Sequence, residues 1–93
     1  MSISQRVIWK WPLSVADSQM VDMHRVRQLL TVQLQDGKPT LWAVINPFTV
    51  KQQVEIRCYG TGNGNPSPED AYLGTVQING FVWHFFERSG ESQ

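Results

Sequence analysis

The sequence predicts a mainly β fold: about six antiparallel strands in a small sandwich or a partly open barrel, with at most one short helical turn. Apolar residues recur with a period of two rather than 3.6, as half-buried strands require. Two dipeptides, Asp36-Gly37 and Asn79-Gly80, each separate two β-like runs. Such dipeptides are typical of two-residue type I′ turns and predict two tight hairpins.

The length of 93 residues allows one domain, over residues 1–93. We expect its ordered core to span about 6–87 and residues 88–93 to form a polar tail. Four Trp, four Phe and two Tyr are many aromatic side chains for so short a chain. Because Cys58 is the single cysteine, no internal disulfide can form, and the aromatic residues are expected to fill the core or a binding face.

The alternating run at residues 6–13 predicts a first strand that ends at Pro12. Its alternation places Trp9 and Trp11 on the same face as Val7 and Leu13, which predicts both tryptophans in or near the core. Residues 14–23 are less regular. Residues 15–19 allow at most one helical turn, and residues 20–23 allow a short strand or an extended loop.

The first hairpin joins residues 28–35 to residues 38–46. Its turn sets the register: Gln35 with Lys38, Leu34 with Pro39, Val32 with Leu41, and Leu30 with Ala43. The predicted core face comprises Leu30, Val32, Leu34, Leu41, Ala43 and Ile45, and Leu29, Trp42 and Val44 lie on the other. Since Pro39 lacks an N–H group, we expect a sheet edge there.

A further strand at 53–59 turns Val54, Ile56 and Cys58 toward the core and Glu55, Arg57 and Tyr59 away from it. A long loop, 60–68, follows it. The second hairpin joins 72–78 to 81–87 and pairs Ile78 with Phe81, Val76 with Trp83, and Gly74 with Phe85. Its predicted core face is Val76, Ile78, Phe81, Trp83 and Phe85, and its other face is Leu73, Thr75, Gln77, Val82, His84 and Phe86.

The composition and the reactive residues argue against several functions. A net charge of zero and a pI of about 6.7 are unusual for a general nucleic-acid binder. Cys58 is expected to be a buried, inert thiol, and His84, opposite Thr75, to make a structural hydrogen bond. Two histidines and one cysteine are too few and too scattered for a metal site. We therefore expect no enzyme activity and no cofactor.

The candidate partner-binding residues lie outside the predicted core. Trp42 is either an exposed interface anchor or is covered by another segment. The glycine-rich loop is either a plain connection or a binding loop, although no helix and no lysine follows it to hold a phosphate. The full set of candidate contacts is Trp42, Arg57, Tyr59, Gly60, Thr61, Gly62, Asn63, Gly64 and Asn65.

The sequence blocks at 8–13, 30–43, 59–62, 72–77 and 81–87 resemble a family of small uncharacterised proteins of bacteriophages and prophages. The resemblance covers roughly residues 6–87 and implies a phage-derived, cytoplasmic, β-rich protein without catalytic residues or cofactor. Members often carry a histidine after the Gly-Thr-Gly motif. Residues 63–66, Asn-Gly-Asn-Pro, stand there instead, so no role of that histidine carries over.

Three functions follow as expectations. The first is non-catalytic binding to a host or phage protein, with anti-defence inhibition of the anti-CRISPR type as the role suggested by analogy with other small phage proteins. The second is an oligomeric sponge for a nucleotide signal, assembled through a sheet edge. The third is a minor structural phage component. No secretory signal and no membrane-spanning run is apparent, which predicts a cytoplasmic protein in a bacterial host.

Overall fold

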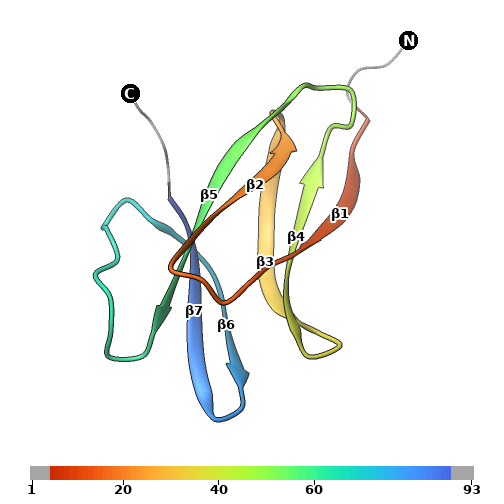
Figure 1. The fold of residues 1–93 in the computed structure, drawn as a ribbon. Helices are drawn as coiled ribbons and strands as arrows, with labels where there is room; N and C mark the ends of the chain where they lie inside the picture. The colour runs from red at the N-terminus through yellow and green to blue at the C-terminus, as the bar shows by residue number, and fades with distance from the viewer. Residues whose placement is uncertain (1–4, 89–93) are drawn as a thin grey trace.

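The computed structural model describes residues 5–88, which form seven antiparallel strands and no helix (Figure 1). The strands are β1 (Val7–Pro12), β2 (Ser18–His24), β3 (Arg27–Gln35), β4 (Lys38–Ile45), β5 (Lys51–Gly60), β6 (Ala71–Ile78) and β7 (Phe81–Arg88). The mainly β prediction is confirmed. The expectation of about six strands is close to the seven observed. The difference lies in residues 18–24, expected as a short strand or extended loop, which form a complete strand with Val21 and Met23 buried in the core.

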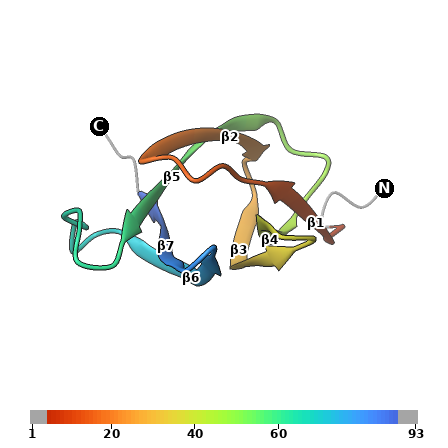
Figure 2. The ribbon, with the colours of Figure 1, turned by 60° about the horizontal axis from the view of Figure 1, so that its bottom comes forward.

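The strands form two sheets, in the orders β1-β4-β3 and β2-β5-β7-β6. Figure 2 shows the two sheets curving around a common interior, with β6 beside β3. No ladder joins the sheets, so the described chain does not close into a barrel. The core lies between them, and its largest fully buried side chains are Phe85, Met23, Leu41, Ile45, Ile56 and Val32.

The first hairpin has the predicted turn and, near that turn, the predicted register. Asp36 and Gly37 both have positive φ, and Gln35, Leu34 and Val32 pair as expected. Beyond Val32 the register shifts, so that Leu29 rather than Leu30 faces Ala43. The bulge turns Leu30 outward (43% exposed) and Leu29 against the core. Leu34 is also exposed, at 40%. The assignment of Leu30 and Leu34 to the core is therefore wrong.

The second hairpin also keeps the predicted register near its turn, and the register shifts farther along the ladder. All three predicted pairs form, and the irregularity lies between Tyr72 and Gly74. It turns Leu73 into the core, contrary to the alternation. Phe81, predicted on the core face, is 65% exposed because it directly follows the turn at the end of the sheet.

The two hairpins meet at one glycine. A Cβ atom at Gly74 would lie 2.1 Å from the carbonyl oxygen of Val32. The hydroxyl of Thr31 donates to the carbonyl of Leu73, at 3.2 Å. Only a residue without a side chain allows β6 to approach the β3 backbone so closely.

Three further expectations need correction. Trp9 lies on β1, an edge strand of its sheet, and is 45% exposed, whereas Trp11 packs against the core. Pro39 lies on a central strand rather than at a sheet edge, and its carbonyl accepts from the Leu13 N–H just beyond the last β1–β4 pair. Arg88 belongs to β7, whereas the rest of the predicted tail, 89–93, lies outside the described residues.

Candidate functional site

A notch opens where β2 stops short along β5. The β2–β5 ladder ends at the pair of Ser18 with Arg57, but β5 continues to Gly60. On its other edge β5 stays paired with β7, with Cys58, Tyr59 and Gly60 opposite Phe85, His84 and Trp83. The last three residues of β5 therefore have a strand on one side only.

Main-chain polar groups face this notch. The N–H of Cys58 donates to the carbonyl of Asp17, at 3.2 Å, on the β2 side. Because the N–H and C=O of one residue in an antiparallel strand point the same way and neighbours alternate, the Cys58 carbonyl and the Gly60 N–H also face the notch. The Gly60 carbonyl accepts from the N–H of Asn63, at 2.9 Å, which folds the loop back over the strand end.

The notch forms a recess of about 450 Å³. The start of β2, the end of β5, the loop and β7 all contribute to its walls. Its lining comprises Asp17, Arg57, Cys58, Tyr59, Gly60, Asn63, Gly64, Asn65 and Trp83. Six of the nine predicted contact residues therefore lie around one hollow, and its volume is within the range of ligand sites.

The charges around the recess leave one carboxylate unmatched. Arg57 Nη1 lies 3.0 Å from Glu55 Oε2, and its guanidinium carbon lies 5.9 Å from the centre of the Tyr59 ring. The side-chain carboxylate of Asp17 forms no hydrogen bond or ion pair within residues 5–88. Burial and the charge of Asp17 raise the pKa of the Cys58 thiol to about 11, so the thiol stays protonated at neutral pH.

The loop is fixed in place over Tyr59. Gly64, at φ +84°, packs on the Tyr59 ring so closely that a Cβ there would lie 2.2 Å from it. Arg88 donates two hydrogen bonds of 2.9 Å to the Asp70 carboxylate and one of 3.1 Å to the Tyr59 hydroxyl. Tyr59 is therefore only 8% exposed, which leaves little of its surface for a direct partner contact.

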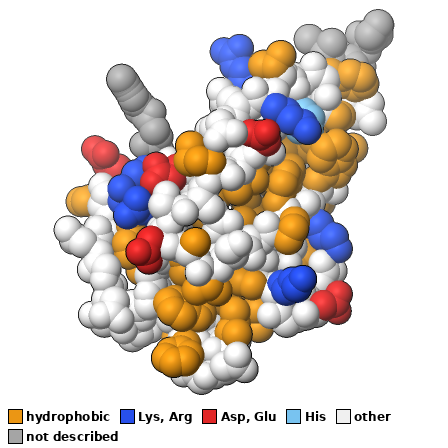
Figure 3. Space-filling model, in the orientation of Figure 1, with side chains coloured by type: hydrophobic (Ala, Val, Ile, Leu, Met, Phe, Trp, Pro, Cys, Tyr) orange, Lys and Arg blue, Asp and Glu red, His pale blue; other side chains and the backbone are white. Residues whose placement is uncertain are grey.

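A second recess lies on the other side of Gly60. Its volume is about 340 Å³, and it is lined by Gly60, Thr61, Asn63, Gly80, Phe81, Val82 and Trp83. The Phe81 and Trp83 ring centres are 6.1 Å apart, and the Trp83 ring packs against Gly60. Figure 3 shows hydrophobic side chains gathered at this lower end of the molecule, where the β6–β7 hairpin turns.

His84 makes the structural hydrogen bonds that the sequence predicts. Its Nε2 lies 2.7 Å from the Thr61 hydroxyl and its Nδ1 lies 3.0 Å from the Thr75 hydroxyl. The Thr75 hydroxyl in turn bonds to the Tyr72 hydroxyl at 2.6 Å. His84 thus ties the start of the loop to β6 across the outer face of the sheet.

Trp42 lies apart from these residues, on β4 of the other sheet. It is half-buried between Lys10 of β1 and Thr31 of β3, and it lines a shallow recess with Ile8, Trp9 and Lys10. Trp42 is thus neither fully exposed nor fully covered, and its burial lies between the two alternatives. The structure does not bring Trp42 together with the other predicted contacts.

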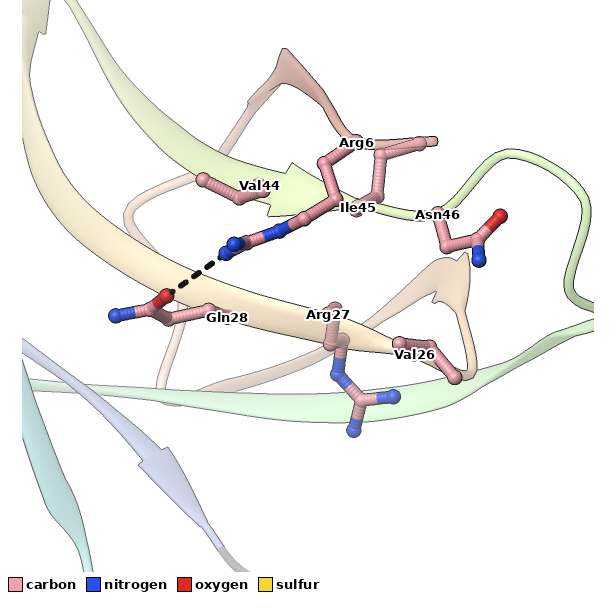
Figure 4. A pocket seen from close by; sticks show the side chains of 7 residues that line it. All are labelled: Arg6, Val26, Arg27, Gln28, Val44, Ile45 and Asn46. Carbon is pink, nitrogen blue, oxygen red and sulfur yellow. Dashed lines mark hydrogen bonds between the residues drawn. The ribbon is translucent and has the colours of Figure 1, made fainter. Parts of the chain in front are cut away.

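A third hollow, of about 520 Å³, lies at the opposite end of the molecule and contains two arginines. In Figure 4 Arg6 points toward Gln28, whose oxygen it meets at 3.4 Å, while Arg27 runs the other way across β5. Arg27 is bonded to Gln52 at 2.8 Å and lies 3.8 Å from Glu87. The two guanidinium groups therefore do not converge on one ligand.

Sequence reasoning missed Asp17, Trp83 and Phe81 as site residues. Asp17 becomes part of the site only through the pairing of β2 with β5, which no local pattern reveals. Phe81 did carry a signal, because the position directly after a two-residue turn lies at the end of a sheet, where the core covers least. Gly62 is exposed and lines neither recess beside Gly60.

Residues 5–88 hold no group of three or more His, Cys, Asp or Glu side chains placed to bind a metal ion. Within the same range, no helix is suited to cross a membrane. The comparison with curated proteins found no match, and the comparison with solved structures found none either. Residues 4–93 match a protein family described as a domain of unknown function (DUF7352). Nearly the whole chain is covered, and the protein therefore belongs to this family.

Proposed function

We propose that this protein is a non-catalytic binding protein that docks on another protein with the end of its second sheet. The docking region, here called the sheet-end surface, comprises Asp17, Arg57, Gly60, Thr61, Asn63, Asn65, Phe81 and Trp83. The observation that carries the proposal is Phe81, an aromatic side chain that is 65% exposed and lines the second recess.

The surroundings of Phe81 suit an interface anchor. Aromatic side chains dominate interface hot spots when they are held in place and surrounded by pockets that a partner can fill. Trp83 holds Phe81 from one side, and the recesses on both sides of Gly60 leave room for partner side chains. The loop beside them is anchored by Arg88 and Asp70, which lowers the entropy cost of binding.

The reactive side chains near this surface favour binding over catalysis. The Cys58 thiol is buried and protonated at neutral pH, so it is a poor nucleophile. Both ring nitrogens of His84 are occupied by threonine hydroxyls. We therefore propose that the protein acts by occupying its partner rather than by transforming it.

The biological role proposed here rests on the resemblance to phage and prophage proteins. It is inhibition of a host or phage protein in the bacterial cytoplasm, with anti-defence inhibition of the anti-CRISPR type as the leading case. The sponge for an anionic nucleotide is less favoured, because the recess contains the unpaired carboxylate of Asp17. A structural role in the virion predicts co-purification with phage particles.

The test uses two phenylalanines of similar exposure. Phe81 is 65% exposed at the β6–β7 turn and Phe48 is 59% exposed in the β4–β5 connection, at the other end of the molecule (Figure 1). The wild-type chain, Phe81→Ser and Phe48→Ser are each used to capture proteins from a lysate of the bacterium that carries the gene. We expect one protein to be held by the wild type and Phe48→Ser and lost by Phe81→Ser. A partner held equally by all three would contradict this surface.

A further inference from the structure

We propose that the notch beside β5 binds an extended peptide of the partner as an added parallel strand, and that this peptide carries a Lys or Arg side chain for Asp17. The inference rests on the proposed function, because it specifies the chemistry of a partner segment at the sheet-end surface. It has two independent supports: main-chain groups left open on a strand edge, and an unmatched negative charge in the same recess.

Two main-chain groups at the end of β5 are open to an added strand. The Cys58 carbonyl and the Gly60 N–H face the notch and are separated by one residue, Tyr59. In a parallel ladder one residue bridges such a pair, donating its N–H to the first group and accepting from the second. The peptide residue opposite Tyr59 therefore makes both bonds. An exposed strand edge of this kind is the usual site of strand addition.

An antiparallel peptide fits less well. It would use the same two groups, but the N–H that it donates to the Cys58 carbonyl would belong to a peptide residue directly opposite Cys58. That place is taken by Asp17, whose carbonyl accepts from the Cys58 N–H. β2 begins only at Ser18, and its ladder with β5 goes no further, so the place of an added strand is open beyond Asp17. The edge of β5 without a partner strand runs only from Cys58 to Gly60, which limits the added strand to a few residues.

The charge in the recess selects the side chain. Glu55 neutralises Arg57 at 3.0 Å, whereas Asp17 forms no ion pair within residues 5–88, so the three groups together carry one net negative charge. In the added strand, side chains alternate between the two faces of the sheet. The peptide residue that follows the one opposite Tyr59 therefore points to the same face as Cys58 and Trp83. A basic side chain there lies over the Trp83 indole and reaches Asp17, which combines a cation–π contact with an ion pair.

The experiment titrates the ¹⁵N-labelled full chain with short peptides and follows the amide resonances by NMR. The probe is Ac-Thr-Val-Lys-Val-NH₂. One control replaces Lys by Glu, and the other carries an N-methyl group on the first Val, which removes the bridging N–H. The protein variants are Asp17→Asn and, as the matched control, Asp36→Asn. Asp36 is an exposed aspartate in the β3–β4 turn, where asparagine also accepts positive φ.

We expect the Lys peptide to shift the Gly60 amide and the loop amides at 63–65, and to bind at least tenfold more tightly than either control peptide. Asp17→Asn should remove the preference for Lys over Glu, and Asp36→Asn should keep it. Three results would overturn the inference: no shift at Gly60 at millimolar peptide, equal binding of the N-methylated peptide, or an unchanged Lys preference in Asp17→Asn. Concentration-dependent Gly60 shifts without peptide would instead assign the notch to a second copy of this chain.

The inference and the proposed function can fail separately. If Phe81→Ser loses the captured partner while Asp17→Asn binds it fully, the sheet-end surface stands and strand addition is wrong. If the Lys peptide behaves as expected while Phe81→Ser keeps the partner, the notch binds peptides and the proposed anchor is wrong.

Discussion

The two tight hairpins, β3–β4 and β6–β7, begin alike and end differently. Each turn places two residues at positive φ, and each ladder keeps its expected register for the first pairs before a bulge turns an unexpected leucine inward. In each hairpin a third strand pairs along the second strand, β1 along β4 and β5 along β7. The hairpins differ in the exposed residue directly after the turn, which is Lys38 in the first and Phe81 in the second.

This difference shows that the turn residues determine the strand pairing near the turn but not which side chains are buried. A type I′ turn determines which residues face each other nearby, but the neighbours of a hairpin determine which of those residues are buried. Phe81 and Phe85 show this within a single strand, since alternation puts them on the same face and only Phe85 is fully buried. Stability measurements on matched variants separate the effect of the turn from the effect of the neighbouring strands.

The largest effect is expected from truncating these two phenylalanines. Phe85→Ala should lower the free energy of unfolding by about 4 kcal/mol, because it leaves a cavity in the core between the sheets. Phe81→Ala should change it by no more than about 0.5 kcal/mol. Urea unfolding followed by tryptophan fluorescence measures both values. Similar losses for the two variants would mean that Phe81 is a core residue.

Gly74→Ala tests the contact between the hairpins. A methyl group there meets the Val32 backbone rather than a movable side chain, and we expect a loss of about 3 kcal/mol. Gly62→Ala is a suitable control because it has positive φ but open space around it, and it should lose about 1 kcal/mol from backbone strain alone. Equal losses in chemical denaturation would show that β6 and β3 do not pack as described.

The two turns should respond equally to alanine. Asp36 and Asn79 have φ values of 53° and 52°, and each alanine variant should lose about 1 kcal/mol because a Cβ disfavours this conformation. Asp36→Asn and Asn79→Asp should restore most of the stability, since both residues tolerate positive φ. Thermal unfolding of the four variants tests this equivalence, and a loss at one turn alone would break it.

The smallest effect concerns the loop attached to the second hairpin. Arg88 holds the pKa of Asp70 below its ordinary value through hydrogen bonds to a carboxylate that is 1% exposed. A carboxyl group whose pKa is lowered by folding stabilises the protein above its unfolded pKa, and this contribution is lost as the pH falls through the folded pKa. Asp70→Asn should therefore be less stable at neutral pH, and the difference from wild type should shrink below about pH 4. A difference independent of pH would exclude the ionised pair as its cause.

The sequence predicts local features of this fold and misses those made by distant pairing. The strands, both turns and the buried Cys58 follow from alternation and turn residues. The bulges do not, because the gain from burying Leu29 and Leu73 depends on the opposite sheet. The site follows the same rule. Gly60 and Asn63 were found as loop residues, whereas Asp17 joins them only because β2 pairs with β5 and then stops.

The sheet-end surface is tested most directly by the affinity of the captured partner for matched variants, measured by titration calorimetry. Phe81→Ser should weaken binding about 30-fold, the loss of a typical hot-spot residue, while Phe48→Ser should stay within about twofold of wild type. Both variants must first give the wild-type unfolding curve. Equal affinity of Phe81→Ser and wild type, or a greater loss in Phe48→Ser, would contradict the assignment of the binding surface to the end of the second sheet.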